Sequence, residues 1–103
     1  MIKVNVKTVN GNIKQITISG HAMYDTYGKD IVCASVSSIT ITTVNALIKL
    51  DENAIDYVQN DDLTITIKKH DEVTCVLIQN MIDLLEELEK DYKKNIKINR
   101  EVS

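Results

Sequence analysis

The 103-residue sequence contains no proline, tryptophan or phenylalanine, and only three glycines, two histidines and two cysteines. The lack of proline and the scarcity of glycine exclude proline-rich linkers and low-complexity tracts. Two cysteines are too few for a disulfide-stapled scaffold, so we expect thiols rather than a disulfide. The chain is therefore predicted to be one ordered domain, spanning residues 1–103, with a moderate core.

The sequence also lacks a large excess of charge of either sign, since 12 basic and 15 acidic residues leave a net charge of −3. A protein that binds nucleic acid without sequence preference needs a basic surface, so no direct nucleic-acid partner is expected. The first residues, MIKVNVKTV, alternate apolar and polar like a strand and unlike a signal peptide. We find no apolar stretch that approaches the roughly 18–20 residues of a membrane span. The prediction is a cytoplasmic protein without a membrane partner.

The first two elements form a predicted hairpin, residues 1–9 with residues 12–19. Apolar residues recur at every second position on both sides of Asn10-Gly11, a dipeptide typical of a two-residue type I′ turn. The alternation slips near Lys14-Gln15, which predicts an irregularity in the strand register there.

Residues 20–31 show no sustained period and are predicted to be a loop, followed by a helix from about Val32 to Leu50. The run from Ile39 to Val44 is β-branched throughout and by itself favours a strand. We favour the helix because the alternation does not persist and the preceding residues are small.

Residues 54–58 and 63–67 are predicted strands on either side of a polar turn. Apolar residues at steps of three and four predict a helix over residues 72–92, and residues 95–99 form a last short strand. The first half of that helix is apolar on several faces, which predicts burial on more than one side or contact with a second subunit. The order ββαββαβ indicates an α+β fold with a mainly antiparallel sheet packed with two helices.

The unusual residues are concentrated, because two glycines, one histidine and one cysteine fall between Gly20 and Cys33. Asp30 is a candidate N-cap, which would place Cys33 near the third helical position. Free backbone N–H groups there lower the pKa of a thiol and can stabilise an oxyanion. His21 lies twelve residues earlier, on a loop long enough to return its imidazole to the thiol.

Packing is the alternative explanation for these residues. A cysteine outside a disulfide is usually a small buried apolar side chain, and Cys75, among Val73, Val76 and Leu77, is predicted to be one. Asp30 either opposes a thiolate or orients the imidazole, and the sequence leaves both roles open. His70 is expected to be solvated. No pair of these residues has metal-ligand spacing, so no metal and no cofactor are expected.

The loop between residues 22 and 29 is a candidate substrate-binding segment. Gly20 and Gly28 bracket it and permit unusual backbone angles, which would allow it to act as a lid. Met23, Tyr24 and Tyr27 either line an apolar substrate pocket or cover the edge of the core.

The stretch GHAMYDTYGKDIVCASVS resembles the signature of the ribosomal-processing cysteine protease family, Prp. That signature has Gly-His-Ala, a short variable loop, Gly-x-Asp-Ile-Val-Cys-Ala and a nearby serine. The matching positions are Gly20, His21, Ala22, Gly28, Asp30, Ile31, Val32, Cys33, Ala34 and Ser37. Ser35 departs from the alanine that is common in the family, which is a small change. Outside the motif, the resemblance extends to chain length and element order.

The resemblance implies a cysteine endopeptidase that removes the N-terminal extension of a bacterial large-subunit ribosomal protein. It implies Cys33 as nucleophile and His21 as general base, with Asp30 and Ala34 in supporting positions and Gly20, Ala22, Met23, Tyr24, Tyr27 and Gly28 in the substrate-binding loop. The resemblance also implies a homodimer, and the apolar first half of helix 72–92 agrees with this expectation.

Two other functions stay open from the residues. A non-catalytic, ribosome-associated module would use the same loop to bind a peptide and would tolerate replacement of Cys33. A redox or thiol-sensing protein would require Cys33 and Cys75 to pair.

Overall fold

The computed structural model describes residues 1–20 and 27–103, without the side chains of residues 27–30. The elements in chain order are β1 (Ile2–Val9), β2 (Asn12–Ser19), α1 (Tyr27–Leu50), β3 (Ile55–Gln59), β4 (Leu63–Ile67), α2 (Glu72–Asp91) and β5 (Ile96–Val102). The predicted ββαββαβ order and the α+β class are confirmed.

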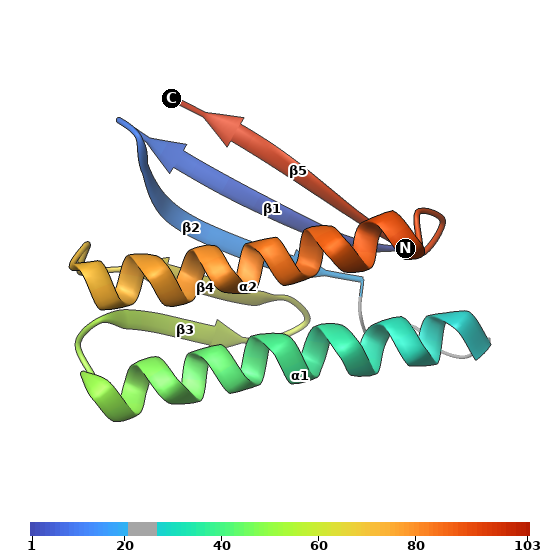
Figure 1. The fold of residues 1–103 in the computed structure, drawn as a ribbon, viewed down its shortest axis with the longest axis horizontal. Helices are drawn as coiled ribbons and strands as arrows, with labels where there is room; N and C mark the ends of the chain where they lie inside the picture. The colour runs from blue at the N-terminus through green and yellow to red at the C-terminus, as the bar shows by residue number, and fades with distance from the viewer. Residues whose placement is uncertain (21–26) are drawn as a thin grey trace.

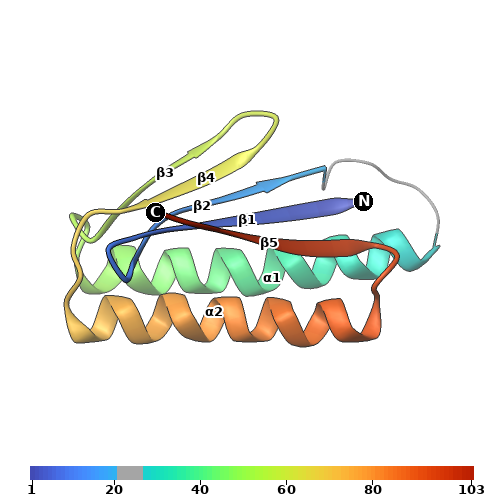
Figure 2. The same cartoon turned by 90° about the horizontal axis from the view of Figure 1, so that it is seen from above.

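The strands form one sheet in the order β3-β4-β2-β1-β5. Three neighbouring pairs are antiparallel, and β5 runs parallel to β1. Figures 1 and 2 show α1 and α2 lying side by side, in opposite directions, on one face of this sheet. The molecule thus has two layers, and the N-terminal end of α1 lies beside the C-terminal end of α2.

The β1–β2 hairpin turns where the sequence predicts. Asn10 and Gly11 have φ angles of 51° and 81°, the left-handed values that a type I′ turn requires. The register shifts between Lys7, which faces Gln15, and Thr8, which faces Ile13. Lys14 is therefore the extra residue of a β-bulge, at the predicted irregularity.

The core lies between the sheet and the two helices. In β1 the even-numbered apolar residues are buried and the intervening polar residues are exposed, because successive side chains point to opposite faces. The fully buried large side chains include Ile16, Ile18, Leu47, Ile65, Ile78, Met81, Ile82, Leu85 and Ile96.

Helix α1 begins at Tyr27, so the prediction of a loop through residue 31 is wrong. The first turns contain Gly28 and polar residues, which give no apolar period and, for glycine, a low helix propensity. The β-branched run from Ile39 to Val44 is helical, as predicted. Thr40 and Val44 are buried in this run, so tertiary packing overrides the local preference for a strand.

The same helix corrects the statement that no apolar stretch is long enough to cross a membrane. Residues Ile31–Leu50 have a mean hydropathy of 1.8, which suffices by length and composition alone. In this fold Val32, Val36, Val44 and Leu47 are buried in the core. The apolar character of α1 is therefore accounted for by its packing as a core helix.

Helix α2 has one buried face. Asp71 caps its start by accepting the Thr74 backbone N–H at 3.1 Å, which fixes where the helix begins. Val73 and Val76 are 52% and 58% exposed. The prediction that the first half of this helix is buried on more than one side is therefore wrong within this chain. Cys75 is also exposed, which corrects its assignment to the core. The helical period places these residues away from the buried stripe that includes Thr74 and Ile78.

Candidate active site

Gly20 ends β2 under a double constraint. Its φ angle is +79°, a left-handed value that side chains rarely adopt. A Cβ atom at this position would also collide with the backbone oxygen of Met1. Glycine is therefore required at the point where the chain leaves the sheet toward His21.

Cys33 is held at the edge of the core by its helix. It is the seventh residue of α1, is half-buried and packs against the core cluster. The neighbouring Val32 and, one turn later, Val36 are buried and anchor this face of α1 to the sheet. Such a position combines a fixed backbone with a side chain that is partly open to solvent.

The predicted link between Cys33 and the first turn of the helix is wrong. Because α1 begins at Tyr27, Asp30 is its fourth residue and is not the N-cap. Cys33 lies in the second turn, where its backbone N–H bonds within the helix and cannot serve as an oxyanion donor. The field of the helix terminus also weakens beyond the first turn.

Several predicted site residues lie outside the described part of the chain. These are His21, Ala22, Met23 and Tyr24, together with the side chains of Tyr27 and Asp30, whereas the backbone of Gly28 lies within α1. Their roles, including the Cys33–His21 pair, stay predictions. Ala34 is described and lies exposed beside Cys33 on α1.

The structure also brings together a set of residues, farther along α1 from Cys33, that the sequence analysis did not identify. Two adjoining cavities lie between α1 and the β3–β4 hairpin and share the lining residues Thr40, Ile41, Gln59 and Leu63. These residues come from separate segments, so no local motif connects them. The only signal in the sequence is the alternation of apolar and polar residues in the strands, which indicates that one face of each strand points inward.

The other histidine and the other cysteine of the chain, His70 and Cys75, lie beside one cavity. This cavity has a volume of about 240 Å³ and also includes Gly11 and Ile13. The His70 Nε2 lies 3.2 Å from the carbonyl oxygen of Ile13, to which a protonated ring nitrogen can donate. His70 is exposed, as expected.

The two cysteines lie near opposite ends of the molecule and are not joined by a disulfide. Each is close to the start of its helix, and the helices run in opposite directions (Figure 2). A disulfide requires Cα atoms within about 7 Å, whereas the length of α1 beyond Cys33 alone is about 25 Å. This geometry is incompatible with the pairing that the thiol-sensor alternative requires.

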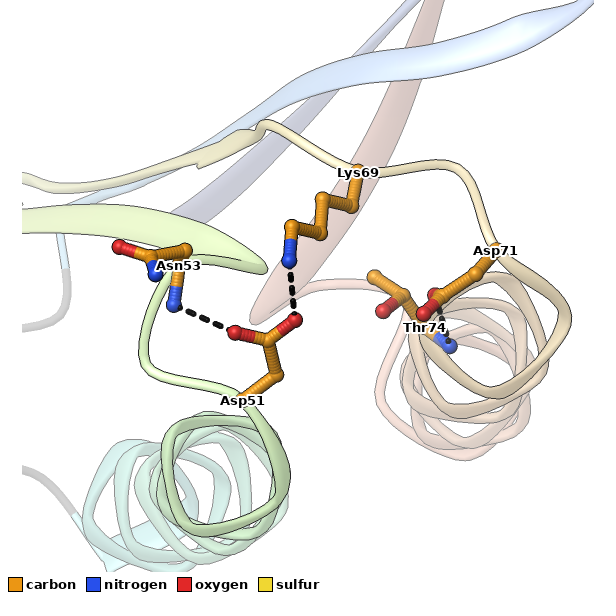
Figure 3. Close-up of polar contacts among 5 residues, drawn as sticks. All are labelled: Asp51, Asn53, Lys69, Asp71 and Thr74. Atoms are coloured by element: carbon orange, nitrogen blue, oxygen red, sulfur yellow. Dashed lines mark hydrogen bonds and ion pairs between the residues drawn. The ribbon is translucent and has the colours of Figure 1, made fainter.

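Three groups with shifted pKa values, Asp51, Lys69 and Asp71, lie at the junction between the end of α1 and the start of α2. Figure 3 shows Asp51 between Lys69 and Asn53. The Lys69 Nζ donates to Asp51 at 2.6 Å, and the Asn53 backbone N–H donates at 2.9 Å. These hydrogen bonds lower the pKa of Asp51, and the same carboxylate raises the pKa of Lys69. The bonds from Thr74 lower the pKa of Asp71. This cluster joins elements and is remote from Cys33.

Within residues 1–20 and 27–103, no three histidine, cysteine, aspartate or glutamate side chains form a group that could hold a metal ion. The chemistry supported by the described residues near Cys33 is that of the thiol itself.

Comparison with known proteins identifies relatives over nearly the whole chain. The sequence model of the family described as cysteine protease Prp matches residues 1–97. The ribosomal processing cysteine protease Prp of Staphylococcus aureus is 34% identical over 106 aligned positions, covering 96% of this chain and 98% of the relative. The protein of the same name from Bacillus subtilis is 31% identical and covers 84% of each chain.

Solved structures show the same fold. The crystal structure of an essential ribosomal processing protease Prp from S. aureus, in complex with a substrate peptide, superposes with a TM-score of 0.91. The two chains are 27% identical, and the alignment covers 98% of this chain and all of the other.

Proposed function

The chain belongs to the cysteine protease Prp family and is a cysteine protease, and we propose that it cleaves the N-terminal extension from a bacterial large-subunit ribosomal protein. The observation that carries the proposal is the match over residues 1–97, with Cys33 half-buried on α1 in the matched region. The relatives are named for ribosomal processing, and one was solved with a substrate peptide.

The reaction follows from the thiol and the imidazole. His21 takes the thiol proton of Cys33, and the thiolate sulfur attacks the carbonyl carbon of the scissile peptide bond. The tetrahedral intermediate collapses when His21 returns the proton to the leaving amine nitrogen. Water then hydrolyses the thioester and releases the second product, which regenerates the thiol.

The decisive experiment compares two cysteine variants. The unprocessed ribosomal protein from the same organism is incubated with wild type, Cys33→Ala or Cys75→Ala, and the products are weighed as intact masses. We expect one N-terminal truncation with wild type and Cys75→Ala. Replacing a nucleophile costs on the order of 10⁶ in kcat, so Cys33→Ala should give no detectable product.

Other outcomes contradict the proposal. If wild type, under reducing conditions, binds the ribosomal protein but does not shorten it, the chain is a peptide-binding module. If Cys33→Ala still cleaves, the nucleophile is misassigned. Loss of cleavage in His21→Ala, with peptide binding retained, is expected for the general base.

We further propose that the protein is a cytoplasmic homodimer whose contact includes the exposed valines at the start of α2. Val73 and Val76 are apolar side chains that this chain leaves more than half exposed. Sedimentation equilibrium should give twice the 11.6 kDa of one chain, and Val76→Glu should shift the mass toward that of a monomer. A monomeric wild type would contradict the dimer.

A further inference from the structure

A groove lies between α1 and the β3–β4 hairpin, and its lining on α1 begins at Val36, three residues after Cys33. It consists of cavities of about 30 Å³ and 170 Å³ that share four lining residues. Figure 2 shows the turn of the hairpin standing away from α1, while the other end lies closer to the helix layer. We call this region the α1–hairpin groove, and its lining residues are Ile18, Val36, Ser37, Thr40, Ile41, Val44, Asn45, Tyr57, Gln59 and Leu63.

Thr40 lines both parts of the groove, and its buried hydroxyl has no hydrogen-bond partner within the described part of the chain. Thr40 is 1% exposed, and its Oγ1 has no hydrogen-bond partner among the described residues. One turn later on the same helix, the Thr43 Oγ1 donates to the carbonyl oxygen of Ile39 at 2.9 Å. An unpaired buried hydroxyl costs free energy, so each such group needs an explanation. A ligand that supplies the missing partner would provide one.

The larger cavity has both apolar and polar lining residues, and its apolar side chains are partly uncovered. Ile41 and Tyr57 are 54% and 48% exposed, and Val44 and Leu63 lie beside them. A cavity of about 150 Å³ with apolar walls is large enough to bind benzene. The larger cavity therefore has room for one apolar side chain.

The groove and Cys33 share one side of α1, although Cys33 itself lines neither cavity. Thr40 follows Cys33 by seven residues, close to two helical turns, so both lie on the same side of α1. Ser37 lies between them and lines the smaller cavity. Seven residues span about 10.5 Å along the helix axis, which an extended peptide covers in about three residues.

We propose that the α1–hairpin groove is a specificity subsite that binds an apolar side chain of the peptide substrate, about three residues from the scissile bond. In the bound peptide, a backbone group beside that side chain completes the hydrogen bond of the Thr40 hydroxyl. This inference rests on the proposed protease function and names the feature of the substrate that the enzyme selects.

A peptide fits these observations better than a second copy of the chain. The lining of the groove on α1 begins about one turn after Cys33, beside which the scissile bond must lie, and an extended peptide carries unpaired N–H and C=O groups at every residue. The exposed valines of α2 are a separate surface and do not line the groove.

The first test uses Thr40→Val, which keeps the shape of the side chain and removes only the hydroxyl. The substrate is a synthetic peptide that spans the cleavage site of the unprocessed ribosomal protein. We expect KM to rise roughly threefold to tenfold with little change in kcat, the effect of one lost neutral hydrogen bond. The melting temperature should stay the same or rise, because the unbound protein loses an unpaired buried group.

Thr43→Val is the matched control on the same helix. It removes a hydroxyl that already has a partner in the unbound protein, so it should lower the melting temperature and leave KM unchanged. If Thr40→Val instead lowers the melting temperature and leaves KM unchanged, the hydroxyl has a structural role and the subsite is wrong.

A second test examines the apolar wall. Tyr57→Ala should weaken binding of the peptide to a Cys33→Ala background at least fivefold, while Val58→Ala should not. Val58 is the next residue of β3, is similarly exposed and does not line the groove. Alanine replacement along the peptide should identify one apolar position, about three residues from the cut, whose effect disappears in Tyr57→Ala.

The outcomes separate this inference from the proposed function. Peptide binding is measured in a Cys33→Ala background. The subsite can therefore be confirmed even if the wild-type protein does not cleave the peptide. If the wild-type protein cleaves the peptide but neither Thr40→Val nor Tyr57→Ala alters KM or peptide binding, the proposed protease function is supported and the proposed subsite is wrong. A change of sedimentation mass in Tyr57→Ala, with unchanged peptide binding, would assign the groove to contact between copies and would also overturn it.

Discussion

Glycine at position 20 is required by backbone conformation and by space. We predict that Gly20→Ala destabilises the protein by more than the roughly 1–2 kcal/mol that a left-handed residue costs, because the added Cβ also collides with Met1. It should also lower kcat/KM at least tenfold, since the chain leaves β2 here toward His21. Thermal unfolding and peptide cleavage measure the two effects.

Gly11→Ala is the control for that variant. Gly11 has a similar φ angle of +81°, but a Cβ there would meet nothing within 4 Å. It should lose only the conformational part of the stability and keep full activity. Equal effects of the two substitutions would show that the contact with Met1 is unimportant.

Cys75 and Cys33 should differ in reaction with a small thiol reagent. Cys75 is exposed and should react as an ordinary surface thiol, whereas Cys33, which His21 activates in the proposed mechanism, should react faster, as intact mass against time would show. Cys75→Ser should retain kcat/KM within about twofold, because its cavity lies at the other end of the helices. A large loss of activity in Cys75→Ser would mean that the two ends are coupled.

At the scale of elements, the junction between α1 and α2 is held by polar contacts of Asp51, Lys69 and Asp71. The folded-state pKa of Asp51 is lowered, so its contribution to stability is present above the unfolded pKa of about 3.9 and is lost as pH falls through the folded value. The pKa of Lys69 is raised, so its contribution is present below about pH 10.4 and is lost above.

We therefore predict that Asp51→Asn lowers the melting temperature slightly at neutral pH, and that the difference from wild type shrinks as pH falls through the lowered pKa of the wild-type carboxylate. The effect should be small because the group is exposed, and should shrink at high salt. Thermal scans of both proteins across this pH range test it. A constant difference at all pH values would assign the effect to packing.

Helix α2 offers a direct comparison of its two faces. Leu85 is fully buried, whereas the adjacent Leu84 is 39% exposed. Leu85→Ala should cost about 2–5 kcal/mol, and Leu84→Ala less than about 1 kcal/mol. Denaturant unfolding measures both, and equal losses would contradict the assignment of the buried face.

At the scale of the whole molecule, the two ends of the chain complete the sheet together. β5 pairs with β1 from Ile2 opposite Ile96 to Thr8 opposite Val102, and Ile96 is fully buried. Truncation after Asn95 should therefore abolish cooperative unfolding, because β1 loses its neighbour and the core loses cover. Truncation after Glu101 should leave a folded protein with lower stability, as circular dichroism would show.

Patterns of neighbouring residues were sufficient to predict most of the helices and strands. The Asn10-Gly11 turn and the slip at Lys14 depend on residues next to one another, so the sequence predicts the hairpin and its bulge. The motif from Gly20 to Cys33 likewise points to the family from its letters alone, since its residues are contiguous.

Other features depend on what packs against each residue. The start of α1 at Tyr27 follows no apolar period, and the exposure of Cys75 depends on which face of α2 meets the sheet. The α1–hairpin groove joins Thr40 to Tyr57 and Leu63, which are far apart in sequence. The sequence by itself determined most of the elements and the type of turn in the first hairpin, and it indicated the nucleophile, because each of these depends on neighbouring residues. Only the tertiary structure decided which side chains are buried, that the two cysteines lie at opposite ends, and that the Thr40 hydroxyl has no partner among the described residues. These features arise from contacts between segments that are distant in the sequence.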